Sequence, residues 1–479
     1  MPPDCLTQKV VLIGCLVGLG GCNVPDVTPP AVAELQSETL GLGPDAAPAA
    51  IADWWTLFHD PQVDALAQQM LQSNPTLQIA LARIRGAQAE LAAADAGRLP
   101  QVRLDGQIQE TLLSDEYVLP APYGGSWRQV GDIQARMTWA LDFWGRQQAQ
   151  IARARSLAEA RTLDSQAARL ALAGAFAQAY IGLLTAWQNI DIARQTVADR
   201  QAILTLTQSR ANSGLENEAA MDQARALVAA AEVEVMALEA ERERAIHAIA
   251  ALAGQGANAY GQIGRPTAAL DAALPLPAAL PADLLSRRPD ILAARSRVTA
   301  ALHGREMAHA DFYPNIDLTA ALGLQSVGLG NLFGAGALTT GIGPAIHLPL
   351  FDAGKLKAQY ALAGSELDIA IGEYNQSVLT AVRQVADALT DVRNLQARRV
   401  RQQAVLEIAQ HALLLAEERY RLGLSDQIVV LNAENLVSQA RRQMVALTAG
   451  LATQRVTLFL SVGGGVAADT LQNAQRGGT

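Results

Sequence analysis

The fold is decided by a stretch of 26 residues, PTLQIALARIRGAQAELAAADAGRLP (75–100), which returns as PDILAARSRVTAALHGREMAHADFYP (289–314). A second pair of matching segments follows: residues 145–214 align without a gap with residues 354–423. Alanine is abundant here, so matched alanines count for little. The comparison depends on the equal spacing of proline and glycine and on two Arg-x-x-x-Gly endings. Self-similarity over this length indicates that the chain is an internal duplication.

Each copy contains a proline-free segment far longer than an ordinary helix. In residues 145–214 apolar side chains recur at spacings of three and four, as on one face of a helix. A continuous helix of this length would rise about 100 Å, which is typical of coiled coils. Shorter proline-free segments follow at 216–252 and 428–460. The pattern therefore predicts two long helical hairpins, each with a glycine C-cap at its tip.

Four segments break the helical pattern with an alternation of apolar and polar residues: about 102–109, 133–143, 316–325 and 339–350, the last interrupted by Pro344. Alternation of period two predicts strands with one apolar and one polar face. Two hairpins packed on a soluble core would fit this pattern, and so would strands of a transmembrane barrel. Four strands cannot enclose a pore, so a barrel would need several chains.

Composition and motifs argue against nucleic-acid binding and against catalysis. The net charge is −9 with an isoelectric point near 5.3 and no basic run, which disfavours a nucleic-acid partner. The six histidines are scattered, and all three cysteines, Cys5, Cys15 and Cys22, fall in the first 22 residues. No phosphate-binding loop or nucleophile elbow is present in the sequence. We expect no catalytic residue, no metal site and no bound cofactor, and therefore no enzyme.

The N-terminal sequence indicates an export signal. Residues 10–19 are apolar but too short to span a bilayer, and the Leu-Gly-Gly-Cys sequence ending at Cys22 resembles a bacterial lipobox. We expect cleavage after residue 21 and a covalent lipid on Cys22. Asn23 follows it, where an Asp would retain a lipoprotein in the inner membrane of enteric bacteria. The alternative is a conventional secretory signal in which Cys22 is incidental.

Short motifs in a fixed order resemble those of one known family, the TolC-like outer-membrane efflux proteins, in particular the lipid-anchored OprM/NodT branch. The resemblance covers nearly all of the mature chain. Its motifs are WWxxFxDP (54–61), LDFWGR (141–146), RRPDI (287–291), FYP (312–314), LPLFDxG (348–354), RYxxG (419–423) and VLNAE (430–434).

The resemblance implies a mainly helical protomer with a membrane β-barrel part, lipid-anchored in the Gram-negative outer membrane and extending into the periplasm. It implies a homotrimer in which each duplicated chain gives four strands to a twelve-stranded barrel and long helices to a periplasmic tunnel. The expected divisions are the signal (1–21), a lipid-anchored segment (22–60), two repeats (61–270 and 271–462) and a flexible tail (463–479).

The implied function is passive conduction of drugs or other toxic small molecules. They would pass from an inner-membrane pump of the RND type, through a periplasmic adaptor, to the exterior. Scattered histidines and only seven methionines argue against a dedicated metal exporter. The alternative function is a periplasmic coiled-coil adaptor or a structural lipoprotein without a pore.

The resemblance also points to working residues at two places. At the hairpin tips, Arg210, Gly214, Arg419, Tyr420 and Gly423 match the family's adaptor-facing ends, although the glycines can equally be plain helix caps. The gate candidates follow the second tip. Asn432 stands where relatives often carry an acid, with Asp426 and Glu434 nearby. We expect Glu434 to lie either in the lumen or on a solvated helix surface.

Overall fold

The computed structural model describes residue 26 and residues 28–116, 122–268, 274–281 and 283–465. Cys22 and the tail from residue 466 lie outside the described residues. The chain divides into two compact units, which are described separately. Unit 1 comprises Met1–Glu34, Ile84–Ala160 and Ala294–Tyr374, and unit 2 comprises Leu35–Arg83, Arg161–Ala293 and Asn375–Thr479.

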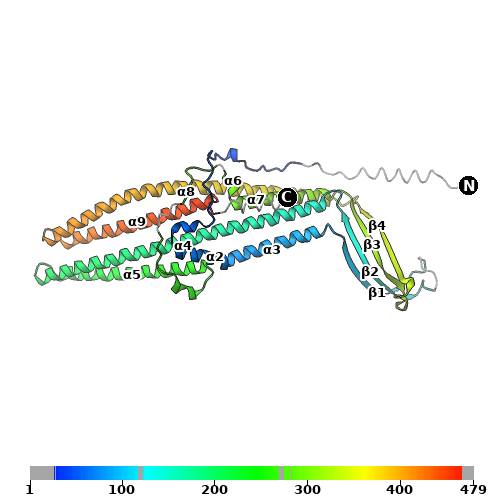
Figure 1. The fold of residues 1–479 in the computed structure, drawn as a ribbon, viewed down its shortest axis with the longest axis horizontal. Coiled ribbons are helices and arrows are strands. Elements are labelled where there is room, and N and C mark those ends of the chain that lie inside the picture. The colour runs from blue at the N-terminus through cyan, green and yellow to red at the C-terminus, as the bar shows by residue number, and fades with distance from the viewer. Residues whose placement is uncertain (1–25, 27, 117–121, 269–273, 282, 466–479) are drawn as a thin grey trace. The chain divides into compact units, whose positions relative to one another are not determined.

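Unit 1 contains one antiparallel sheet in the order β1-β2-β3-β4 (Figure 1). Its strands overlap the four alternating segments of the sequence, but each begins or ends one to six residues away from the predicted limit. The register pairs Val102 with Met137, and Ile133 with Leu324, so apolar positions meet apolar positions across the sheet. The strands are β1 (Gln101–Leu112), β2 (Trp127–Leu141), β3 (Asn315–Val327) and β4 (Leu338–His347).

Long helices make up most of the remaining described residues. Four of them contribute residues to both units: α3 (Pro75–Ala96), α4 (Arg146–Asn212), α7 (Pro289–Ala310) and α8 (Lys355–Arg421). Unit 2 also contains α2 (Pro61–Ser73), α5 (Glu218–Leu252), α6 (Leu284–Arg287) and α9 (Gln427–Ser461). Because α4 and α8 each have 67 residues and α5 and α9 each have 35, the two copies match element by element.

Two helical hairpins, α4–α5 and α8–α9, turn at glycines with left-handed backbone, φ 71° at Gly214 and 74° at Gly423. The Leu215 amide donates to the Arg210 carbonyl at 2.9 Å, and the Leu424 amide donates to the Arg419 carbonyl at 2.8 Å. The glycine amides complete a Schellman C-cap at each tip, since Gly214 donates to the Ala211 carbonyl at 2.9 Å and Gly423 to the Tyr420 carbonyl at 3.0 Å. A residue with a Cβ adopts this left-handed backbone only with strain.

The duplication extends to packing at the other end of the return helices. A Cβ at Gly254 would lie 2.7 Å from the Ser73 carbonyl oxygen, and one at Gly463 would lie 2.6 Å from the Arg287 carbonyl oxygen. Ser73 and Arg287 are themselves equivalent positions of the two copies. Gly463 and Gly464, which the sequence prediction placed in a flexible tail, are buried, and the Gly464 carbonyl accepts from the Ile51 amide at 2.7 Å.

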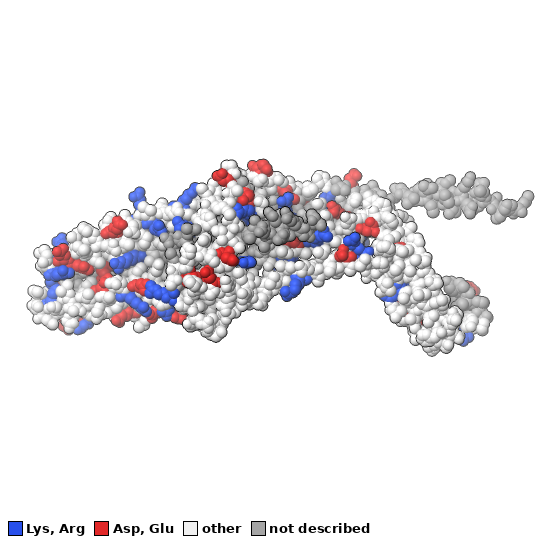
Figure 2. Space-filling view, viewed as in Figure 1, with Lys and Arg blue, Asp and Glu red and all other residues white. Residues whose placement is uncertain are grey.

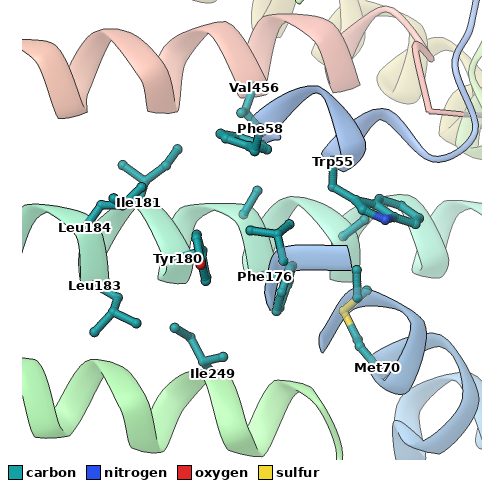
Figure 3. Close-up of a cluster of buried hydrophobic side chains, with 14 of the residues drawn as sticks. Trp55, Phe58, Met70, Phe176, Tyr180, Ile181, Leu183, Leu184, Ile249 and Val456 are labelled. Carbon is teal, nitrogen blue, oxygen red and sulfur yellow. The ribbon is translucent and has the colours of Figure 1, made fainter. Parts of the chain in front are cut away.

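The main core of unit 2 gathers aromatic side chains from the start of the chain around α4 and α9 (Figure 3). The short helix η3 (Trp54–Phe58) places Trp54 against Phe459, with ring centroids 5.8 Å apart. Asp60 is 3% exposed and accepts from the Tyr180 hydroxyl at 2.6 Å. Burial opposes ionisation of Asp60, but this bond and backbone bonds from Thr267, Gln62 and Ala268 together lower its pKa. The WWxxFxDP motif is thus a structural anchor.

Candidate functional sites: the sheet, the hairpin tips and helix α9

The sheet has one face that is suited to lipid. Alternation places apolar side chains on this apolar face in all four strands, and most remain exposed within the chain; Leu104 is 74% exposed and Ile342 is 75% exposed. Figure 2 shows few charged groups over the strands in the visible face, whereas charges gather over the helices. The face includes Val102, Leu104, Ile108, Leu112, Ile133, Met137, Trp139, Leu318, Leu322, Leu324, Leu338, Ile342 and Ile346.

The opposite, polar face carries compensating charges. Arg103 lies 3.0 Å from Asp105, and Arg136 lies 3.7 Å from both Asp105 and Asp132. All four side chains are partly or largely solvent-accessible, so these pairs stabilise the sheet by at most about 1 kcal/mol each. A sheet with a polar, charged face on one side and an apolar face on the other has the pattern of a membrane β-barrel, whose strands face water inside and lipid outside.

The sheet is open at both edges. Among the described strands, β1 pairs only with β2, and β4 pairs only with β3. Unpaired backbone groups at an edge are costly in a bilayer, where water cannot satisfy them. A sheet of this kind becomes a membrane structure only when its edges are paired with further strands.

The structure separates the five predicted tip residues into two groups. Arg210 and Tyr420 face each other inside the tip: the guanidinium carbon lies 4.7 Å from the ring centroid, and Nη1 donates to the Tyr420 carbonyl at 3.2 Å. Tyr420 is 1% exposed, and its burial raises its pKa. Glu216 is 3.3 Å from the Arg210 Nε. Arg210 and Tyr420 therefore join the two hairpins and are not themselves a docking surface.

The remaining tip residues, Gly214, Arg419 and Gly423, are exposed. The sequence prediction placed the tips at residues 210–215 and 419–424 but did not single out their leucines, Leu215, Leu422 and Leu424, which are 65–67% exposed. The two hairpins thus end in a small apolar surface beside an arginine. The repeated Gly-Leu at positions 214–215 and 423–424 is the sequence signal that could have identified this surface.

The gate candidates also fall into two groups, exposed and buried. Asn432 and Asp426 are exposed, whereas Glu434 is 3% exposed and lies against α4. Both expectations for Glu434, a lumenal carboxylate or a solvated one, are wrong, because its position on α9 shares the buried stripe of Val430, Leu431 and Val437. Near the tip the exposed stripe of α9 is uncharged between Gln427 and Ala440, with Ile428, Val429, Asn432, Asn435, Leu436 and Gln439.

Glu434 occupies an unusual environment for a carboxylate. Its Oε1 lies 3.4 Å from the Arg200 Nε, but no described atom donates a hydrogen bond to either carboxylate oxygen. Arg200 uses its other nitrogens to donate to the Leu227 carbonyl at 3.0 Å and to the Asn435 Oδ1 at 2.9 Å. Burial raises the pKa of Glu434 to about 7, and Arg200 opposes the shift. Asp199 and Glu417 add like charge nearby.

Polar contacts join the two hairpins along their length. The Gln427 amide donates to the Thr207 hydroxyl at 2.8 Å, Thr196 and Ser438 share a hydrogen bond of 3.2 Å, and Arg442 donates to Glu234 at 2.8 Å. Together with Arg200, these contacts replace part of the apolar seam usual between packed helices.

The buried carboxylate predicts a pH dependence of stability. Because the folded pKa of Glu434 is raised above its ordinary 4.5, neutral Glu434 favours the folded state at low pH, and this contribution disappears as the pH rises toward 7. Glu434→Gln, which stays neutral, should therefore be more stable than the wild type at pH 8, by up to about 3 kcal/mol, and equal to it near pH 4. Denaturant unfolding at both pH values measures this difference.

The control is Glu418→Gln, the same substitution at an exposed position of α8, measured at both pH values beside Glu434→Gln. A Glu434→Gln protein that is less stable than the wild type at pH 8 would show that the Arg200 ion pair outweighs the burial of the carboxylate.

The described residues include no candidate metal cluster, but they include two long apolar helices. They contain no group of three or more His, Cys, Asp or Glu side chains placed to hold an ion. Helices α4 and α9 are long and apolar enough to cross a membrane. However, apolar side chains of both, including Phe176 and Val456, pack into the unit 2 core (Figure 3). We therefore assign the membrane contact to the sheet.

A four-stranded sheet with a lipid-compatible face and open edges, joined to two long helical hairpins, defines one subunit of a multi-chain outer-membrane channel. The family model described as outer membrane efflux protein matches residues 66–255 and 280–464. The chain therefore belongs to the outer membrane efflux protein family. It lies in the outer membrane as an efflux channel component, as the sequence resemblance implied. Because the match spans both repeats, the alternative of a pore-free adaptor or structural lipoprotein is set aside.

Relatives and solved structures agree with this assignment. The chain is 30% identical over 472 residues to the multidrug resistance outer membrane protein MdtP of Escherichia coli (strain K12), covering 95% of each chain. It is 30% identical over 481 residues to the pyoverdine export outer membrane protein OpmQ of Pseudomonas putida, covering 97% and 99%. The structure of the outer membrane protein VceC of Vibrio cholerae matches with a TM-score of 0.81 and 32% identity, over 87% of this chain and 99% of that one.

Proposed function

We propose that three copies of this chain form a passive twelve-stranded channel that receives small organic molecules from a pump and an adaptor and releases them outside the cell. The observation that carries the proposal is the open four-stranded sheet, whose two free edges, β1 and β4, can pair with neighbouring copies. Three sheets of four strands leave no edge in lipid and are wide enough for an aqueous lumen. In that barrel the apolar face contacts lipid and the polar face lines the lumen.

The hairpin tips are the proposed adaptor contact. Leu215, Leu422 and Leu424 form an exposed apolar surface beside the exposed Arg419. Exposed leucines beside a cation suit a partner that offers apolar side chains and a carboxylate. The exposed stripe of α9 with Ile428 and Asn432 leads away from this surface, so we propose an uncharged constriction there in place of an acidic ring.

The class of cargo follows from the relatives, which are named for multidrug resistance, fusaric acid resistance and pyoverdine export. All three names concern small organic molecules. We extend that class to this chain. No catalytic step is proposed, because the pump supplies the energy and the channel supplies the path.

The function is tested by expressing the chain in a Gram-negative host that lacks its own efflux channels, with and without an adaptor and a pump encoded beside it. Accumulation of a fluorescent dye should fall only when all three proteins are present. If accumulation stays unchanged although all three reach the envelope, the proposed partnership is wrong. If accumulation falls without the pump, efflux through this channel does not depend on the pump, and the proposed partnership is likewise wrong.

The lipid on Cys22 remains a prediction, since this residue lies outside the described residues. Cells given an alkyne fatty acid should label the wild-type protein but not Cys22→Ser, because only the thiol at that position can carry the thioether-linked lipid. Loss of the anchor should leave folding intact, since the proposed barrel is held in the membrane by its own lipid-facing strands. Equal labelling of the two proteins would exclude acylation at Cys22.

A further inference from the structure

The connection between β3 and β4, residues 328–337, is folded back onto the sheet. It contains two short helical turns, η5 (Leu329–Asn331) and η6 (Ala335–Ala337). The Gly328 amide donates to the Gln129 carbonyl at 2.7 Å, and the Ser326 hydroxyl donates to the Gly328 carbonyl at 2.6 Å. These bonds fix the start of the connection, which we call the β3–β4 turn.

Gly131 shows on which face of the sheet this turn lies. A Cβ at Gly131 would be 3.1 Å from the Cδ2 atoms of both Leu329 and Leu332, so these leucines fill the space where a side chain would stand. Gly131 is paired with Ile108 and alternates in phase with Ile133, which places it on the apolar face. The β3–β4 turn therefore covers the face that contacts lipid, and not the face that lines the lumen.

The turn carries its own exposed apolar group. Leu332 is 3% exposed and fixes the turn to the sheet, whereas the next residue, Phe333, is 80% exposed. The sequence from residue 318 to residue 351 contains no Asp, Glu, Lys or Arg. The other connection, between β1 and β2, differs: it contains Asp115 and Glu116, and Arg128 at the start of β2 lies over the Tyr123 ring.

We propose that the β3–β4 turn is a membrane-interface anchor, in which Phe333 inserts into the outer leaflet of the outer membrane. Three observations select lipid as the occupant. The turn is continuous with the apolar face that meets the membrane, it has no charge that would need water, and its aromatic group projects from a backbone held by Leu329 and Leu332. Membrane barrels carry girdles of aromatic residues at both interfaces.

Both connections lie at the end of the strands opposite their junctions with the helices (Figure 1). Since the helices extend into the periplasm in the proposed channel, this end faces the exterior. The two connections then have different roles: the acidic β1–β2 connection meets water, and the uncharged β3–β4 turn meets lipid. In a channel of three copies, this spaces three aromatic anchors around the outer rim.

Photocrosslinking in intact outer membranes tests the assignment. Phe333 is replaced by p-benzoylphenylalanine, which retains an aromatic ring, and the same replacement is made at Tyr123 and at Ile342. Irradiation should link position 333 to lipopolysaccharide several-fold more than position 123 and about as much as Ile342, which serves as the lipid-facing reference.

The other outcomes overturn the proposal. A 333 adduct that contains only a second copy of the chain would show that Phe333 covers a protein contact. The absence of any adduct at 333, with strong lipid adducts at 342, would place the turn in water. A second comparison is independent of the probe: Phe333→Asp should lower the amount of membrane-embedded channel several-fold relative to Phe333→Leu, whereas Tyr123→Asp should not.

Discussion

Ile108→Arg is expected to abolish most of the heat-stable channel in the outer membrane, whereas Gln107→Arg in the neighbouring position leaves it intact. Ile108 is 64% exposed on the apolar face of β1, where the proposed channel contacts acyl chains. Arginine on the lipid face of a barrel costs about 2–4 kcal/mol at the bilayer midplane and less toward the interfaces. Three copies multiply that cost in one assembly. Migration of unheated membrane samples on denaturing gels measures the fraction assembled.

Gln107 is the control because it is adjacent to Ile108 on β1 and lies on the opposite, polar face of the sheet. Its register partner on β2 is Asp132, so an arginine introduced at 107 meets a carboxylate and, in the proposed channel, the water of the lumen. If Ile108→Arg and Gln107→Arg reduce the heat-stable channel equally, the sheet does not have one lipid face and one lumenal face. If neither variant reduces it, Ile108 does not contact lipid.

A double replacement at the hairpin tips, Gly214→Trp with Gly423→Trp, should remove efflux-dependent resistance while the channel still assembles. A Cβ at either glycine would have no described atom within 4 Å, so the new side chains project away from the protomer. The left-handed backbone adds strain of about 1–2 kcal/mol at each site, which is local to an exposed turn. The indole groups would cover the apolar tip surface that is the proposed adaptor contact. Dye accumulation and channel level are measured together.

The control variant Gly145→Trp distinguishes the effect of side-chain bulk at the tips from the effect of backbone strain. Its φ is 77°, and a Cβ there also has no described atom within 4 Å, so Gly145→Trp imposes the same kind of strain away from the tips. This variant should keep efflux. Asparagine accepts a left-handed backbone readily, so Gly423→Asn should keep it as well. Normal resistance in the double tip variant, with normal channel level, would refute adaptor docking at these turns.

The architecture could be predicted from the sequence because its signals are local and periodic. Two proline-free segments ending in Arg-x-x-x-Gly predicted the helices that the structure places at Arg146–Asn212 and Lys355–Arg421. The strand segments could be recognised in the sequence because one face of the sheet meets lipid and the other meets water. These two environments impose a strict alternation of apolar and polar residues. Strand limits were less certain, since Trp127 and its neighbours at the start of β2 are set by pairing with β1 and not by their own composition.

The working residues were predicted less well, because exposure depends on which helix packs against which. Periodicity identifies a buried stripe on α9 but does not say that Glu434 belongs to it, since glutamate is ordinarily an exposed residue. Glu434 is buried beside Arg200, which is 234 positions away in the chain. Arg210 and Tyr420 were likewise chosen as exposed docking residues, but they contact each other across the hairpins.

The sequence by itself determined the duplication, the helix lengths, the four alternating strands and the family, because each of these is written in spacing along one chain. Only the tertiary structure decided that Glu434 is buried, that Arg210 and Tyr420 join the hairpins, and that Leu329 and Leu332 fold over Gly131 on the lipid face. Those features depend on side chains brought together from distant positions. Their burial and pKa are properties of the packed neighbourhood and not of the residue.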